Sequence, residues 1–291
     1  MSINSKSFDE VLKIAENELT LPYFYSTPEN IYALSGFGND PLLRPKIISF
    51  LENSFDILRK VACDKKTEKD KIWNYDTLVM VNHVIFGAIG RTVGMLNATE
   101  LAPLLYKEFV DMEDSVYRIN YEEKGTLAIA LSILGYQGEI KEIQDTLDDA
   151  VSNEHYILER EDILEMFYAF CILKNDKTRA LDYLSNHKRT KNLSLVAAAL
   201  ADLDAKEGLP VLKERLLQLS SPFTKEAFLE AIHRLETQKE APAPKDRMIW
   251  MFGKRSTTEI ELGHEPDNAF VLRAIKKNGS EEFEEYYESF Y

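Results

Sequence analysis

The strongest constraint on this chain is an apolar helical stripe that recurs along its middle. In the clearest copy, apolar residues follow the i, i+1, i+4, i+5, i+8 spacing that places side chains on one face of an α-helix. A pattern that returns every few tens of residues, with a second helix between copies, is typical of stacked helical pairs. The clearest copy is Leu195, Val196, Ala199, Leu200 and Leu203, and similar runs occur at Val84 to Ile89, Leu127 to Gly135, Ile163 to Cys171, and Phe228, Leu229, Ile232 and Leu235.

The segment from Asp204 to Leu212 is the best single unit of this pattern. A short turn contains Asp204, and the helix that follows has Pro210 near its start. In these features the segment resembles HEAT-like repeats of the α-solenoid superfamily, and the resemblance extends over roughly residues 76–236. The resemblance implies an all-α fold, a right-handed α-solenoid of antiparallel helix pairs with a short irregular C-terminal appendage. Because the step between stripes varies, an irregular helical bundle without a repeat is the alternative.

Changes in composition predict three regions. A charged stretch ends an N-terminal helical cap at residues 1–70, and the helical repeats follow at 71–239. Pro242 and Pro244 begin a Pro/Ala linker, which is extended and fairly stiff in other proteins. The linker and an acidic, aromatic C-terminal appendage make up residues 240–291, where we expect at most a short strand near Thr258 and a helix near Asp267.

The charge of the chain disfavours nucleic acid as a partner. The formal net charge is −14 at pH 7, from 49 acidic and 35 basic residues, so a phosphate backbone would be repelled. The same charge favours a basic protein or peptide, or simply keeps the protein in solution. No run of 18 apolar residues is present, so we expect no membrane span. We expect no signal peptide, and a reduced, buried Cys171 in a cytoplasmic protein.

Local motifs for catalysis are absent from the sequence. The five histidines are isolated, and neither a His-Glu-x-x-His nor a Cys-x-x-Cys motif occurs. No P-loop or Gly-x-Ser-x-Gly motif occurs either. We therefore expect no catalytic residue, metal or cofactor, although a site assembled from distant residues stays open.

These features favour a non-catalytic scaffold or adaptor that grips a protein or peptide, such as an inhibitor, immunity or assembly factor. One alternative is a HEAT-like enzyme or cofactor handler, since some bilin lyases resemble HEAT solenoids. Another is self-regulation, in which the chain after Lys245 folds back onto the groove. Two candidate surfaces for a partner are an acidic helix face and an alternation of acidic and aromatic residues at the end of the chain. The candidate partner-binding residues are Glu139, Glu142, Asp145, Asp149, Phe283, Tyr286, Tyr287 and Phe290.

Several local structures also follow from the sequence. Ser7 and Glu10 form a capping box, which predicts the start of a helix. The Gly36-Phe37-Gly38 segment predicts a turn with positive φ. Gly87, Gly90 and Gly94 lie within a predicted helix and indicate close approach of a neighbouring backbone.

Overall fold

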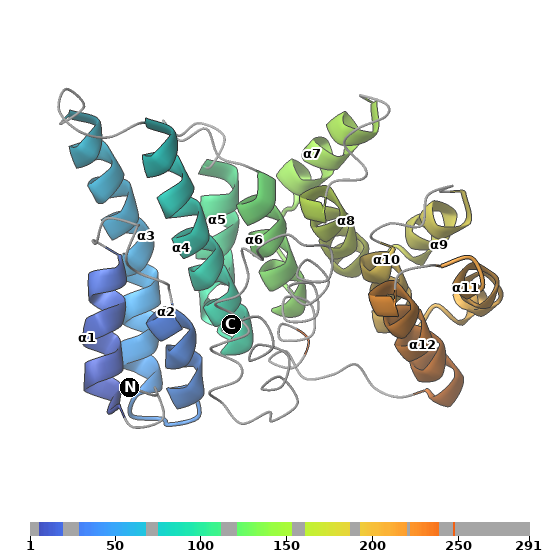
Figure 1. Cartoon of the computed structure of the whole chain (residues 1–291), viewed down its shortest axis with the longest axis horizontal. Coiled ribbons are helices and arrows are strands. Elements are labelled where there is room, and N and C mark those ends of the chain that lie inside the picture. The colour runs from blue at the N-terminus through green and yellow to red at the C-terminus, as the bar shows by residue number, and fades with distance from the viewer. Residues whose placement is uncertain are drawn as a thin grey trace.

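The computed structural model describes residues 6–19, 29–67, 75–111, 121–152, 161–186, 193–219, 222–238 and 247. Within these ranges the protein consists of twelve α-helices and three short 3₁₀ helices, and no strand is found (Figure 1). The all-α prediction is confirmed for this part of the chain. None of the helices described is both long and apolar enough to cross a membrane. The strand and helix predicted near Thr258 and Asp267 lie outside the described residues.

The N-terminal helices pack on one end of the molecule. Helix α1 (Phe8–Glu18) begins at Ser7, whose hydroxyl accepts a hydrogen bond from the Glu10 backbone N–H at 3.4 Å, while the Glu10 side chain accepts one from the Ser7 backbone at 2.7 Å. The predicted capping box is therefore confirmed. Helix α1 contacts α2 (Glu29–Ala33) and the 3₁₀ helix η3 (Leu34–Phe37), and α3 (Arg44–Thr67) contacts α4.

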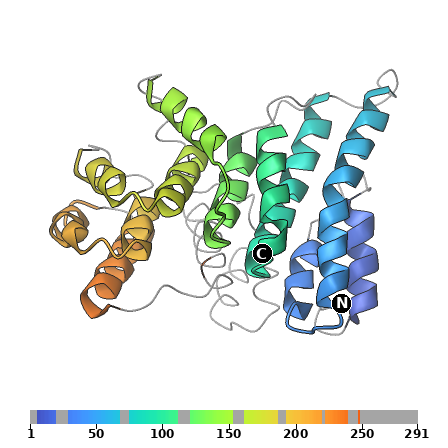
Figure 2. The same ribbon diagram turned by 180° about the vertical axis from the view of Figure 1, so that it is seen from behind.

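Five helices form a row through the rest of the molecule, and each contacts the next. They are α4 (Tyr75–Met95), α6 (Tyr121–Ile133), α8 (Glu161–Lys174), α10 (Ser194–Asp202) and α12 (Pro222–Thr237). Shorter helices pack against this row: α5 contacts α6, α7 contacts α8, α9 contacts α8 and α10, and α11 contacts α12. Figures 1 and 2 show the row from opposite sides, with α1 at one end and α11 and α12 at the other. The shorter helices are η4 (Thr99–Leu101) with α5 (Ala102–Asp111), α7 (Lys141–Ser152), α9 (Lys177–Asn186), and η5 (Lys206–Gly208) with α11 (Leu209–Leu216).

The core follows from the apolar stripes. In α10 every residue from Ser194 to Ala201 is buried, because the helix is enclosed by α8, α9 and α12. Buried apolar side chains from Phe8 to Leu235 form one continuous cluster. The stripe predicted on α12 is wrong at one position, since Phe228 is buried but Leu229 is 54% exposed. Helix α12 is the last helix described in the row, so no further helix of the row covers that face.

Four helices of the row end in the same way. A residue with left-handed backbone conformation follows each helix: Asn97, Gly135, Asn175 and Asp204, with φ of 48°, 65°, 53° and 49°. The next residue's N–H then donates to the carbonyl five positions back, which is the Schellman arrangement. These bonds are Ala98 N to Val93 O (3.1 Å), Tyr136 N to Leu131 O (3.1 Å), Asp176 N to Cys171 O (2.9 Å) and Ala205 N to Leu200 O (2.9 Å).

Two of these helix ends share sequence as well as backbone. Ala98 has φ −84° and ψ 71°, and Ala205 has φ −84° and ψ 73°. Each alanine is followed by a 3₁₀ turn and a helix with an early proline, Pro103 or Pro210. The two segments match the pattern Ala-x-Glu-x-x-Pro-x-Leu, from Ala98 and from Ala205. The turn that contains Asp204 therefore has a second copy at Asn97.

The glycine predictions are corrected in part. The Gly36-Phe37-Gly38 segment lies in and directly after η3, and Gly38 has φ −65° rather than a positive φ. A Cβ at Gly38 would lie 2.2 Å from Leu96 Cδ2, so a larger residue there would have to displace the Leu96 side chain. In α4, a Cβ at Gly90 would lie 2.7 Å from Leu127 Cδ2 of α6, so the close neighbour is a side chain rather than the predicted backbone. At Gly87 a Cβ would meet nothing within 4 Å, so the prediction of close packing is wrong there.

Candidate functional site

Three polar residues that depart from the repeat belong to α8, α10 and α12. The helices of the row can be aligned by numbering their residues backwards from the left-handed residue that follows each helix. Two positions before it, α4, α6 and α8 have Met95, Ile133 and Leu173, but α10 has Asp202. The repeat therefore accepts an apolar side chain where Asp202 introduces a charge.

The same count identifies two more exceptions. Seven positions before the left-handed residue, α4, α6 and α10 carry small residues, whereas α8 carries Tyr168. In α12 the left-handed residue is Gln238, with φ 55°. Arg234 lies four positions before it. The other four helices have apolar residues or cysteine at that place. The small residues are Gly90, Ala128 and Ala197, and the counterparts of Arg234 are Val93, Leu131, Cys171 and Leu200.

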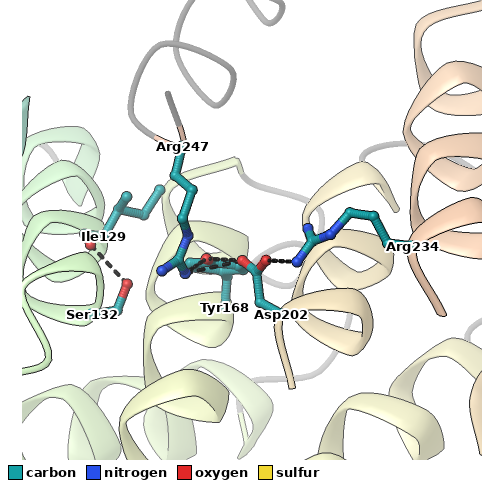
Figure 3. A network of polar contacts seen from close by, with 6 residues as sticks. All are labelled: Ile129, Ser132, Tyr168, Asp202, Arg234 and Arg247. Carbon is teal, nitrogen blue, oxygen red and sulfur yellow. Dashed lines mark hydrogen bonds and ion pairs between the residues drawn. The ribbon is translucent and has the colours of Figure 1, made fainter. Parts of the chain in front are cut away.

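These three exceptions meet at one point (Figure 3). The Tyr168 hydroxyl donates to Asp202 Oδ2 at 2.6 Å, and Arg234 Nη2 forms an ion pair with Asp202 Oδ1 at 2.6 Å. Arg247, which follows the linker in sequence, completes the cluster. Its Nη2 donates to Asp202 Oδ2 at 3.0 Å and to the Tyr168 oxygen at 2.6 Å. Helices α8, α10 and α12 and residue 247 are thus joined through one carboxylate.

The cluster is well shielded from solvent. The side chains of Asp202, Arg234 and Arg247 are 4%, 8% and 14% exposed. Figure 3 shows Arg247 lying between α6, marked by Ile129 and Ser132, and the Tyr168–Asp202 pair. A carboxylate buried to this degree is stabilised only if it is paired and hydrogen-bonded. Here Asp202 Oδ2 accepts hydrogen bonds from Tyr168 and Arg247, whereas Oδ1 has the ion pair with Arg234 but no hydrogen bond.

The protonation states of the cluster favour binding over catalysis. Burial and the neighbouring Asp202 carboxylate hold the pKa of Tyr168 well above its usual value, so the phenol stays neutral and serves as a hydrogen-bond donor. Burial disfavours the charged guanidinium of Arg247, but contact with Tyr168 and Asp202 raises its pKa overall. The Asp202 carboxylate lies between the Arg234 and Arg247 guanidinium groups. The geometry therefore suits recognition of a cation rather than proton transfer. No group of three potential metal ligands occurs among the residues that the structure describes.

The predicted acidic surface lies on and next to α7. Glu139 and Asp145 are exposed and Glu142 is partly exposed, while Ile143 and Leu147 bury the opposite side of the helix. Asp149 lies within α7, and its side chain is outside the described part. Two ion pairs partly offset this charge: Asp145 with Lys141 at 3.9 Å and Asp148 with Arg179 at 3.1 Å. Phe283, Tyr286, Tyr287 and Phe290 lie outside the described residues.

An aromatic pair adjoins this acidic surface and was missed in the sequence. The Tyr106 and Tyr136 rings stack with centroids 5.3 Å apart, and the Tyr106 hydroxyl lies 3.5 Å from the Glu142 backbone nitrogen, which donates to it. Gly138 makes room for the Tyr136 ring, because a Cβ there would lie 2.1 Å from the Tyr136 oxygen. Burial raises the pKa of both tyrosines, and the neighbouring Glu139 carboxylate adds to the effect. The edge at α7 therefore combines carboxylates with stacked rings.

Sequence reasoning also missed the cluster around Asp202. The apolar spacing of its helix places Tyr168 in the core, and no local motif distinguishes Asp202 or Arg234. The available signal was a charged residue inside an otherwise apolar helix, which only an alignment of the repeats makes visible. No protein-family model, curated protein or solved structure matches the chain.

Proposed function

We propose that the protein is a non-catalytic scaffold that binds a basic protein or peptide. In this proposal the row of helices is a right-handed HEAT-like α-solenoid, and the acidic edge at α7 contacts the client. The single observation that carries the proposal is that Glu139 and Asp145 are exposed and Glu142 is partly exposed, on and next to α7 in an acidic molecule. The buried, unpaired Cys171 suits a reducing compartment, so we place the protein in the cytoplasm.

Two further features support a repeat scaffold. The Schellman ends recur at four helices of one row, which favours stacked units over an irregular bundle. Stacked helical pairs present an extended surface, and such surfaces commonly bind proteins. The stacked Tyr106 and Tyr136 rings beside carboxylates suit lysine or arginine side chains, because aromatic faces attract cations.

The experiment compares two charge-reversal variants of the full chain. One variant carries Glu139→Lys, Glu142→Lys and Asp145→Lys, and the control carries Glu16→Lys, Glu52→Lys and Glu214→Lys. The control residues are exposed and belong to three other helices, and both variants change the net charge equally. A client is first identified by affinity purification from the native host and is then titrated against each purified protein.

We expect the α7 variant to bind the client at least tenfold more weakly, because complementary charges at an interface set affinity and specificity. The control should change affinity less than about threefold, through long-range charge alone. Equal weakening in both variants would show that only net charge matters and would contradict the proposed edge. Failure to recover any stoichiometric protein client would contradict the scaffold function.

A further inference from the structure

We propose that Asp202 and Tyr168 form a receptor for an arginine side chain. In the isolated protein Arg247 fills this receptor, and an arginine of a protein partner replaces it. The inference goes beyond the proposed function, because it uses α8 and α10 and needs no residue of α7. It also differs from a general acidic attraction, since it names one buried carboxylate and one phenol.

The two guanidinium groups on Asp202 have different origins. Arg234 is part of α12, which packs on α10, so this arginine belongs to the row itself. Arg247 lies nine residues beyond Gln238, the last described residue after α12, and Pro242 and Pro244 lie between them in sequence. Of the four side chains in the cluster, Arg247 alone comes from outside the row and is the most exposed of its three charged members. It is therefore the member that can leave without rearranging the helices.

Charge balance also separates the two arginines. Asp202 and Arg234 already form a neutral pair at 2.6 Å. Arg247 adds a second positive charge that neutralisation of the carboxylate does not require. Without Arg247, the Asp202 Oδ2 and Tyr168 oxygens each keep lone pairs that point to the place its Nη2 occupies. The vacated place is thus a ready acceptor for another cation.

The chemistry of the place favours arginine over lysine. The Arg247 side chain is only 14% exposed. Any side chain that takes its place must therefore lose most of its hydration water. A guanidinium is more weakly hydrated than an ammonium and is better suited to buried ion pairs. The stem of an arginine also packs well against apolar side chains. Figure 3 shows Arg247 beside α6, on the side of Ile129. The net charge of −14 would draw a cationic segment toward the molecule.

The repeat indicates that this cluster is not required by the fold. At the position of Asp202, α4, α6 and α8 have Met95, Ile133 and Leu173, and the last helix, α12, has the exposed Glu236; at the position of Tyr168 the other helices have glycine or alanine. Positions that break an otherwise consistent pattern are expected at functional sites. Three such positions converge on one carboxylate, and that carboxylate holds an arginine from a distant part of the chain.

The test uses the full chain, and the probe is N-acetyl-arginine amide. Arg247→Ala empties the proposed receptor, and binding is followed by protein-observed NMR at low salt. The matched control is Arg179→Ala, which removes an arginine of α9 that is ion-paired with Asp148 of α7 at 3.1 Å, outside the row. A second variant, Arg247→Ala with Tyr168→Phe, keeps the carboxylate but removes the phenol oxygen. N-acetyl-lysine amide serves as the competing ligand class, and circular dichroism checks the fold of each variant.

We expect Arg247→Ala to bind the arginine probe with a dissociation constant on the order of millimolar, as a ligand of this size allows. The wild-type protein should bind at least tenfold more weakly, because its own arginine competes at a high effective concentration. In the variant that also carries Tyr168→Phe, the affinity for the arginine probe should fall severalfold. In Arg247→Ala, the lysine probe should bind severalfold more weakly than the arginine probe. The shifted signals should come from residues around Asp202.

Three results would overturn the proposal. The first is an Arg247→Ala protein that is folded but binds no more probe than the wild type. The second is equal binding of the arginine and lysine probes, or an equal gain in Arg179→Ala. The third is loss of folding in Arg247→Ala, which would make Arg247 part of the scaffold rather than an exchangeable ligand.

Discussion

The unit of α4, η4 and α5 and the unit of α10, η5 and α11 share one turn geometry but differ at a buried position. Their turns have nearly the same φ and ψ at Ala98 and Ala205, and both continue into a helix with an early proline. Yet the first unit has Met95 where the second has Asp202. The shared turn shows what the fold needs, and the difference shows what it does not need. The charge of Asp202 is an addition to a scaffold that is complete without it.

The largest expected effect tests the shared part of the two units. Leu200 and Val93 are fully buried, and their carbonyls accept the Schellman bonds of the two units. Leu200→Asp or Val93→Asp should unfold the protein, because burying an unpaired carboxylate costs several kcal/mol, comparable with the stability of a whole domain. Thermal melting by circular dichroism measures the effect.

The control for this prediction is Leu217→Asp, since Leu217 is 87% exposed. It should leave the melting temperature nearly unchanged. A melting temperature within about 2 °C of wild type for Leu200→Asp would contradict the assignment of the stripe to the core.

The next effect tests the difference between the units. Asp202→Met should lower the free energy of unfolding by about 3–5 kcal/mol, because it leaves the buried Arg234 without a counter-charge. Met95→Leu at the matching position should cost less than about 1.5 kcal/mol, as a volume-conserving change does. Urea denaturation compares the two. Similar losses of unfolding free energy in the two variants would contradict the prediction, because they would make the position equally sensitive to substitution in both units.

A smaller effect separates backbone strain from packing. Gly135 has φ 65° and Gly87 lies within α4, and a Cβ at either would meet nothing within 4 Å. Gly135→Ala should destabilise the protein by about 1 kcal/mol, since only the left-handed conformation penalises it. Gly87→Ala should stabilise it by up to about 1 kcal/mol through helix propensity. Changes of the same sign in urea denaturation would contradict the assigned helix end.

The thiol of Cys171 should show the smallest effect at neutral pH. Cys171 occupies the position of Val93 and Leu200, and burial raises its pKa to about 12. The thiol is therefore neutral at pH 7 and should not react with an aromatic disulfide reagent in a Cys63→Ser background until urea is added. Because the native pKa is raised, this group favours folding below about pH 9 and loses that contribution as the pH rises toward 12. Rapid labelling of the native protein would contradict its burial.

The sequence predicts the helices well because their signals are local. The stripe around Leu200 and the cap at Ser7 each depend on residues within a few turns, and both are confirmed. The helix ends were harder to predict, since Asn97, Asn175 and Asp204 adopt a conformation that glycine signals more clearly. The exposure of Leu229 could not be read from spacing either, because it depends on which helix is last in the row.

The candidate site was beyond local reasoning for a different reason. Tyr168, Asp202, Arg234 and Arg247 come from four separate segments, and only packing brings their side chains together. The acidic face of α7, in contrast, follows from spacing along one helix, and its exposed side was predicted for Glu139 and Asp145. Binding at that face stays a prediction.

The most direct test of the central claim replaces the whole cluster by apolar residues. The variant carries Tyr168→Phe, Asp202→Met, Arg234→Met and Arg247→Met, and its free energy of unfolding is measured by urea denaturation. If the charge is an addition to a complete scaffold, the variant should fold with a stability within about 1 kcal/mol of wild type, since apolar replacement of a buried ion network is often neutral or stabilising. A loss as large as that of Asp202→Met alone would contradict the claim and make the cluster a requirement of the fold.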